Sequence, residues 1–149
     1  MLAKDIMTTD VITITEDMPV KQIAELFVKN NISGAPVVDD TGTLIGIVTE
    51  SDLVYQEKPL TAPYFINILD AFFQINRKEY QEDFKKITAT TAGTLMVKKP
   101  FTATADTDIS EIAKLIIQHR INRVPIIDEE NKVIGMVSRH DIVKSMIDQ

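Results

Sequence analysis

The chain contains one short pattern twice, GIVTESD at residues 46–52 and GMVSRHD at residues 135–141. Each copy has a glycine, two apolar residues, a hydroxyl residue, two variable residues and an aspartate. A shift of 89 positions places Met7 on Met96, and the register then holds to the end of the pattern without any insertion. Chance matching cannot hold one register over such a length, so we infer an internal duplication.

Each copy predicts the same order of elements. Residues 11–15 alternate apolar and hydroxyl side chains, as a half-buried strand does. Residues 18–30 place apolar side chains on one helical stripe, with Pro19 near the start, and Thr107 or Asp108 is the N-cap in the second copy. A hairpin and a second helix follow. One such unit buries little apolar surface alone, so we predict an α/β (α+β) fold of two tandem β-α-β-β-α units packed sheet to sheet as a pseudo-twofold pair.

The predicted organisation is a first repeat at residues 1–57, a helical linker at 58–91 and a second repeat at 92–149. The linker lacks glycine, and its apolar and aromatic residues recur at spacings of three and four from Phe65 to Phe84. This spacing predicts one long amphipathic helix. Two interpretations of its apolar face stay open: it covers the repeats, or it meets another chain.

Composition excludes several classes of function. The net charge of −6 argues against nonspecific nucleic-acid binding, which normally shows a basic surplus. The absence of cysteine excludes disulfides, thiolate catalysis and cysteine zinc sites. The start of the sequence lacks the apolar run of a signal peptide, and no uncharged apolar stretch is long enough to predict a membrane span. We therefore expect a cytoplasmic protein.

The repeated pattern suits a phosphate and a ribose. It begins on a strand and ends in the first helical turn, so Thr49 or Ser138 lies where unpaired N–H groups and the helix dipole favour an anion. Asp52 or Asp141, three residues later, offers a carboxylate to vicinal hydroxyls such as those of ribose. The glycine leaves the strand bare, so that a flat base could approach the backbone. The alternative interpretation is an ordinary capping box, with aspartate in place of glutamate.

The stretches PVVDDTGTLIGIVTESDL and PIIDEENKVIGMVSRHDI, preceded by KDIM and GTLM, resemble paired CBS motifs, the unit called a Bateman module. The resemblance covers both repeats, and the aromatic linker is similar to that of stand-alone bacterial or archaeal CBS-pair proteins. It implies two units packed through their sheets, usually dimerising into a flat disc. It also implies a regulatory and non-catalytic protein that binds AMP, ADP, ATP, S-adenosylmethionine or a related adenosine ligand in clefts between the repeats.

The resemblance also implies roles for individual residues. Asp52 and Asp141 would hold ribose hydroxyls, and Thr49 and Ser138 would hold phosphate or ribose. Backbone groups and side walls for the base, and an apolar floor, would come from a further set: Ile12, Thr13, Ala35, Pro36, Phe101, Thr102, Val124 and Pro125.

The two copies differ in charge around these positions. Gly34 of the first copy aligns with Arg123, and Glu50-Ser51 aligns with Arg139-His140. A phosphate would therefore meet Arg123, Arg139 and His140 in the second copy and a carboxylate in the first. We predict that the cleft using Asp141 is the stronger anion site, although Arg123 could serve the opposite cleft. A surface role for Arg120 and Arg123, pairing with Asp128 or Glu129, is the alternative.

Other classes of function have less support in the sequence. The only histidines, His119 and His140, belong to no recognisable metal or nucleophile pattern, so we expect no metal site and no enzyme. A ligand-free scaffold that dimerises and presents the aromatic linker helix to a partner is the main alternative. The favoured interpretation is a homodimeric sensor that binds an adenosine ligand and signals to a separate effector protein.

Overall fold

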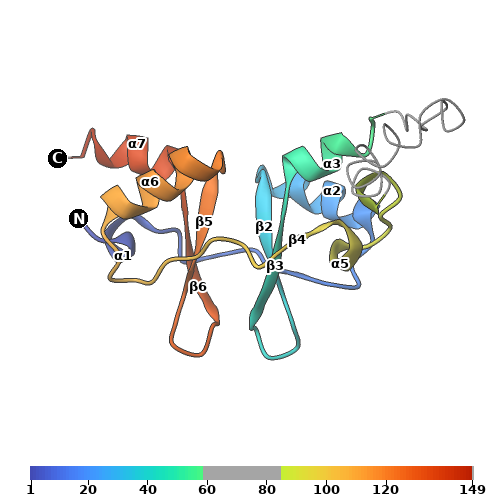
Figure 1. The fold of residues 1–149 in the computed structure, drawn as a ribbon, viewed down its shortest axis with the longest axis horizontal. Helices are drawn as coiled ribbons and strands as arrows, with labels where there is room; N and C mark the ends of the chain where they lie inside the picture. Colours follow the sequence, from blue (N-terminus) through green and yellow to red (C-terminus); the bar gives the residue numbers. More distant parts are fainter. Residues whose placement is uncertain (59–84, 149) are drawn as a thin grey trace, which may run out of the picture.

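The computed structural model describes residues 1–58 and 85–148 of the chain. Two lobes lie side by side in this part of the chain, each built around an antiparallel hairpin with helices packed on its outer side (Figure 1). The predicted α/β fold of two tandem units is confirmed.

The two hairpins have matching geometry. They are formed by β2, Gly34–Val38, with β3, Leu44–Thr49, and by β5, Arg123–Ile127, with β6, Val133–Ser138. In the first hairpin the strand register shifts between Val37 and Val38, and in the second it shifts between the equivalent residues Ile126 and Ile127. Such irregularities bend and twist a strand locally. The duplication therefore extends from the sequence to fine detail of the backbone.

The two long helices start and stop at equivalent positions. They are α2, Val20–Asn30, and α6, Ile109–His119. Pro19 is the N-cap of α2, whereas the Asp108 side chain caps α6 by accepting a hydrogen bond from Ser110 N at 2.8 Å. Both helices end at a residue with left-handed backbone, Asn31 and Arg120. The predicted helices and the Asp108 cap are thus confirmed.

A short helix follows each hairpin, and a short strand precedes the first long helix. The helices are α3, Glu50–Tyr55, and α7, Arg139–Ser145. The strand predicted at residues 11–15 is only two residues long: β1, Ile14–Thr15, runs parallel to β2. Its counterpart in the second copy is a single bridge between Ala103 and Ile126.

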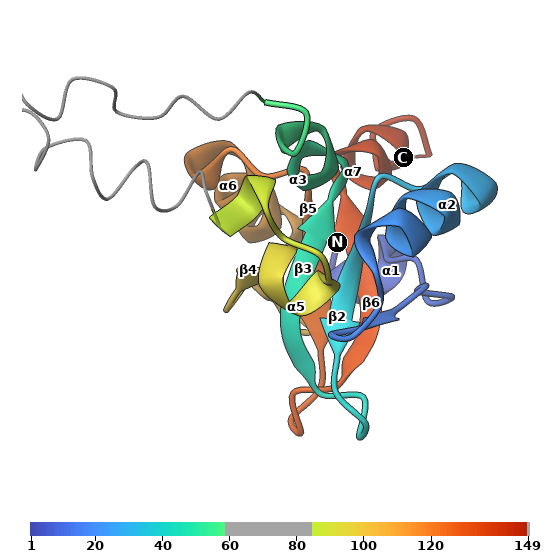
Figure 2. The same cartoon turned by 90° about the vertical axis from the view of Figure 1, so that its right-hand side faces the viewer.

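The lobes exchange the first segments of the two repeats. Helix α1, Ala3–Ile6, packs on α7 and β6 of the second lobe. Helix α5, Ala92–Leu95, packs on α2, β1 and β3 of the first lobe, and β4, Val97–Lys98, extends the first sheet beside β3 (Figures 1 and 2). The repeats at 1–57 and 92–149 therefore describe the sequence, whereas each lobe combines parts of both.

Backbone hydrogen bonds hold the exchanged segments. Ala3 N donates to Thr107 O at 2.8 Å, and Thr8 N donates to Met136 O at 2.9 Å. In the first lobe, Ala92 N donates to Met18 O at 2.9 Å. Because buried backbone groups need such partners, neither lobe is complete without the segment supplied by the other repeat.

The exchange explains the repeated glycine. A Cβ atom on Gly46 would collide with the side chain of Met96, and a Cβ atom on Gly135 would collide with that of Met7. Both methionines belong to exchanged segments. The structure therefore assigns these glycines to close packing of a crossing segment, where the sequence suggested room for a flat base.

Each lobe has its own apolar core. The fully buried Ile23 of α2 and its equivalent Ile112 of α6 are at the centres of the two clusters. The lobes also touch near the hairpin turns, where Leu44 N donates to Asn131 O at 3.0 Å. The helical spacing predicted in the linker, from Phe65 to Phe84, lies outside the described residues. After it, residues 85–87 are helical, and Gln56 Nε2 donates to the carbonyl oxygens of Lys86 and Ala89.

Candidate functional site

Two clefts open at the junction of the lobes, and both are lined by residues from both repeats. We call the cleft beside Thr49 the first cleft, with a volume of about 840 Å³, and the cleft beside Asp141 the second cleft, with a volume of about 420 Å³. Ser33, Asn122 and Arg123 line both of them. The clefts are therefore neighbours that share a wall.

The second cleft brings together most of the residues singled out for one site. The predicted residues that line it are Ile12, Arg123, Ser138, Arg139, His140 and Asp141. Residues that sequence reasoning missed complete the wall, among them Thr8, Asp10, Asn31 and Ser33. Thr8 reaches the cleft through the segment exchange, and Asn31 and Ser33 come from the loop after α2. No local sequence pattern marks any of these as a wall residue.

Ser138 and Asp141 form a capping box at the start of α7. Ser138 N and Ser138 Oγ both donate to Asp141 Oδ2 at 2.7 Å, and Asp141 N donates back to Ser138 Oγ at 3.3 Å. The capping interpretation is therefore confirmed in this copy. The other carboxylate oxygen, Oδ1, has no hydrogen-bond partner among the described residues, and the side chain is partly exposed on the cleft wall. One oxygen is available to a ligand.

Asp52 forms the same cap, and both of its carboxylate oxygens have hydrogen-bond partners. Thr49 N and Thr49 Oγ1 donate to its Oδ2 at 2.9 and 3.2 Å, and Lys86 Nζ lies 2.9 Å from its Oδ1. The side chain is buried, and it does not line the first cleft, which is lined by Thr49 and Glu50 at that helix end. The two repeated aspartates therefore have different environments.

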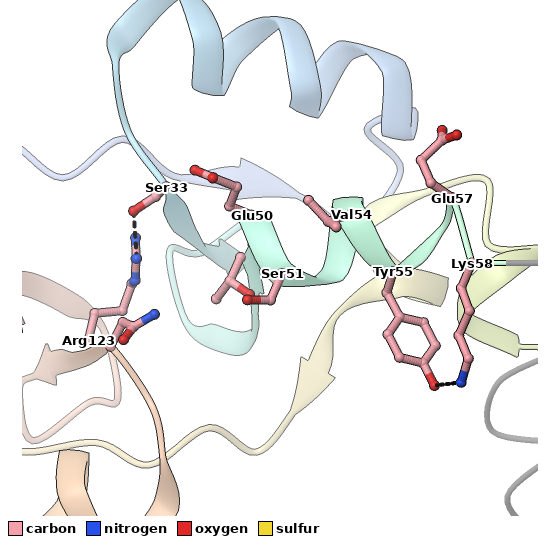
Figure 3. A pocket seen from close by; sticks show the side chains of 10 residues that line it. Ser33, Glu50, Ser51, Val54, Tyr55, Glu57, Lys58 and Arg123 are labelled. Atoms are coloured by element: carbon pink, nitrogen blue, oxygen red, sulfur yellow. Dashed lines mark hydrogen bonds between the residues drawn. The ribbon is translucent and has the colours of Figure 1, made fainter.

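Arg123 crosses from the second lobe to the first. Its Nη2 donates to Ser33 Oγ at 2.7 Å (Figure 3), and its buried Nε has no hydrogen-bond partner among the described residues. A Cβ on the equivalent residue, Gly34, would overlap the guanidinium group. Burial lowers the pKa of Arg123 from its ordinary value, and the Glu50 carboxylate opposes this effect. The alternative prediction, in which Arg123 forms a surface pair with Asp128 or Glu129, is therefore wrong.

The two clefts differ in which charged side chains line them. Glu50 and Glu57 line the first cleft, together with Lys58, whose Nζ lies 3.2 Å from the Tyr55 hydroxyl (Figure 3). Exposed Arg139 lines the second cleft, with Asp10 and Asp141 as its acidic residues. The guanidinium group of Arg123 is common to both clefts. Acidic and basic side chains therefore balance in each cleft, and the number of charges does not by itself make the second cleft the stronger anion site.

The remaining predicted residues do not gather around either cleft. Four belong to the buried core beneath the clefts: Ala35, Pro36, Val124 and Pro125. Phe101 is stacked on the His119 ring, with centroids 3.7 Å apart, and it does not line the first cleft. Thr13 is exposed, and Thr102 lines a separate cavity beside α6. Thr13, Phe101 and Thr102 therefore line neither the first nor the second cleft, whereas the family resemblance implied that they form walls for the base.

No helix within residues 1–58 and 85–148 is long and apolar enough to cross a membrane. No group of histidine, aspartate and glutamate side chains in that part of the chain is arranged to hold a metal ion.

The CBS domain family matches residues 3–59 and 92–148 of the chain. An uncharacterized protein of Methanocaldococcus jannaschii is 34% identical over 155 residues, covering 99% of this chain and 92% of that protein. A second relative is the chloroplastic CBS domain-containing protein CBSX2 of Arabidopsis thaliana. It is 27% identical over 128 residues, which cover 83% of this chain and only 53% of that relative.

Solved structures share the fold along nearly the whole chain. The structure of CBSX2 in complex with AMP has a TM-score of 0.83 at 24% identity, and the match covers 99% of this chain and 97% of that one. The CBS domain pair of protein MJ0100, in complex with 5′-methylthioadenosine and S-adenosyl-L-methionine, has a TM-score of 0.73 at 25% identity and coverage of 98% and 99%. With two matched repeats in a shared fold, the chain belongs to the CBS domain family and contains a pair of CBS domains.

Proposed function

We propose that the second cleft binds an adenosine ligand that carries a phosphate, and that binding regulates a separate effector protein. The observation that carries the proposal is the unpaired Oδ1 of Asp141 on the wall of a cleft that Arg123 and Arg139 also line. An acceptor for hydroxyl groups thus lies in the same cavity as two cations. A ribose phosphate presents the complementary pair of groups.

Each group of the ligand has a counterpart. Asp141 Oδ1 would accept hydrogen bonds from the ribose 2′ and 3′ hydroxyls, while its Oδ2 stays in the helix cap. Arg139 and Arg123 would meet the phosphate. Ile12 would contact the base from the first repeat. Because Ile12 and Asp141 come from different repeats, a bound ligand would bridge them and favour one relative arrangement of the lobes.

The charges in the cleft favour a phosphate over a sulfonium group. The two structural relatives were solved with different 5′ substituents, AMP in CBSX2 and S-adenosyl-L-methionine in MJ0100. Arg123 and Arg139 attract the first and repel the second, and Asp10 is the only acidic residue outside the cap among the described residues of this wall. We therefore infer that AMP, ADP or ATP binds more tightly here than S-adenosylmethionine.

We also propose that the chain forms a homodimer through its helical face. Large apolar side chains are exposed at equivalent positions of both lobes: Val28 and Ile117 are 83% and 72% exposed, and Val54 and Val143 are 66% and 57% exposed. They belong to α2, α6, α3 and α7, which flank the two hairpins at the end away from the hairpin turns (Figure 1). A patch with internal twofold character suits a self-complementary interface with a second copy. The bound state would reach the effector as a change in dimer shape.

A binding panel tests the ligand. AMP, ADP, ATP, S-adenosylmethionine, NADH and cyclic di-AMP are each added to the protein and to its Asp141→Ala variant in a thermal melt. A ligand present at about 100 times its dissociation constant should stabilise the protein by about 2.7 kcal/mol. The increase should be largest for the phosphate-bearing nucleosides and should disappear in Asp141→Ala.

The matched control is Asp52→Asn, which alters the other copy of the pattern and should keep the increase. If none of the six compounds raises the midpoint, the ligand proposal is wrong, and a ligand-free dimerisation scaffold becomes the better description. If catalysis were the function, a product of the nucleotide would accumulate in the same mixtures.

A further inference from the structure

We propose that Lys86 is a specificity-determining residue that closes Asp52 to ligand hydroxyls, so that the chain binds one nucleotide, in the second cleft. The inference rests on the proposed function, in which the aspartate of the repeated pattern reads a ribose. It adds a reason for the two copies to behave differently, and it assigns that reason to a residue outside both copies of the pattern.

The contact gives each carboxylate oxygen of Asp52 a hydrogen-bond partner. Lys86 Nζ lies 2.9 Å from Asp52 Oδ1, and Thr49 occupies Oδ2 from the backbone and the hydroxyl. The Asp52 side chain is only 5% exposed, whereas that of Lys86 is 37% exposed. A ribose hydroxyl would have to displace a charged donor from a nearly dry carboxylate. A neutral hydroxyl is the weaker partner in that exchange, because hydrogen bonds between charged groups are the stronger ones.

The backbone around Lys86 is held in place. Gln56 at the end of α3 donates from its Nε2 to Lys86 O at 3.0 Å and to Ala89 O at 2.8 Å. The ammonium group also lies 5.4 Å from the centroid of the Tyr55 ring. A lysine whose backbone and ammonium group are both fixed loses little further freedom when it pairs with Asp52. The closed state is therefore built into the first lobe.

Among the described residues, the second copy has no such device. The residue equivalent to Gln56 is Ser145, whose hydroxyl donates to Ile142 O within its own helix. No lysine or arginine side chain among the described residues forms an ion pair with Asp141, and its Oδ1 stays open to the cleft. Comparing Asp52 with Asp141 in the same molecule therefore separates the effect of the repeated pattern on ligand access from the effect of Lys86.

Calorimetric titration with AMP tests the proposal by counting sites. We expect one site per chain in the natural protein and none in Asp141→Ala. The variant Lys86→Ala should bind two. In the double variant Lys86→Ala/Asp141→Ala one site should remain, and adding Asp52→Asn should abolish it. Lys85→Ala, which removes the neighbouring lysine, is the matched control and should leave a single site.

Two more variants distinguish the loss of the lysine charge from a folding defect. Lys86→Met keeps the aliphatic stem without the charge and should open the site, whereas Lys86→Arg keeps a cation and should leave it closed. A purely structural ion pair would change the melting midpoint in these variants without changing the number of sites. Circular dichroism and a thermal melt establish that each variant is folded before it is titrated.

The outcomes separate this proposal from the proposed function. Two sites in the natural protein, or no site in the folded Lys86→Ala/Asp141→Ala variant, would overturn the role of Lys86, and in either case binding at Asp141 could stand. No site in the natural protein but one site in Lys86→Ala, lost on adding Asp52→Asn, would support Lys86 and refute ligand binding in the second cleft. An absence of AMP binding in every variant would refute both.

Discussion

The two lobes have the same backbone and different clefts. Both have a hairpin with the same register shift, a long helix that ends in a left-handed residue, and a capping box at the start of the last helix. They differ where a side chain reaches across: Lys86 satisfies Asp52 while Asp141 stays open, and Arg123 fills the space that Gly34 leaves. A duplication can therefore preserve a fold while a single long side chain makes its two sites unequal.

The largest expected effect tests whether the lobes are equivalent in stability. Ile23→Ala and Ile112→Ala each remove a fully buried side chain at matching positions, so each should lower the free energy of unfolding by about 2–5 kcal/mol. Because the exchanged segments tie the lobes together, both variants should still unfold in one transition. Denaturant melts followed by circular dichroism and by tyrosine fluorescence measure this. Two separate transitions would show that the lobes are independent.

The next effect concerns the position where glycine faces arginine. Gly34→Ala puts a Cβ on the Arg123 guanidinium, and the resulting overpacking should cost about 1–3 kcal/mol of unfolding free energy. The double variant Gly34→Ala/Arg123→Ala removes the clash, so it should be more stable than the sum of the single variants predicts. Additive effects in this cycle, measured by denaturant melts, would contradict the close contact.

A smaller effect compares the two aspartates of the repeated pattern. Asp52→Asn loses the ion pair with Lys86, whereas Asp141→Asn loses no ion pair, and both amides can still accept within the cap. We expect a cost of about 1–2 kcal/mol for Asp52→Asn, reduced from the full value for a charged hydrogen bond because Lys86 is partly exposed. The cost for Asp141→Asn should be smaller in the same melts. Equal costs would mean that Lys86 contributes nothing measurable.

The smallest effect compares the hairpin turns. Hydrogen bonds from Thr41, first from its hydroxyl and then from its N–H, lower the pKa of Asp39 below its ordinary value. A carboxyl whose pKa is depressed by folding stabilises the protein above its unfolded pKa, and this contribution is lost as the pH falls through the folded pKa. Asp39→Ala should therefore destabilise the protein at pH 7 and have less effect near pH 2.

The hydroxyl is the part of this turn that differs between the copies. The equivalent Asp128 accepts from Glu130 N and Lys132 N, and Glu130 stands where Thr41 does. Thr41→Val should raise the pKa of Asp39, which an NMR titration of the side-chain carboxyl measures. An unchanged titration would remove the hydroxyl as the cause.

The fold and several residues of the second cleft are predictable from local sequence signals. Hairpins, helix ends and capping boxes depend on residues close together in the chain, so their signals were readable in both copies, down to the cap at Asp108 and the pair Ser138–Asp141. The same pattern predicted equal roles for Asp52 and Asp141, because a local motif contains no information about what approaches it from elsewhere.

Which residues the repeated pattern contacts depends on the path of the whole chain. Met7 and Met96 lie against Gly135 and Gly46 through the segment exchange, Arg123 reaches Ser33 across the lobes, and Lys86 reaches Asp52 from 34 residues away. Each contact joins residues that no periodicity or spacing relates, since their distance depends on how the whole chain returns on itself. Local chemistry therefore specified the elements of this protein, and the path of the chain between them decided which of its two aspartates remains open to a ligand.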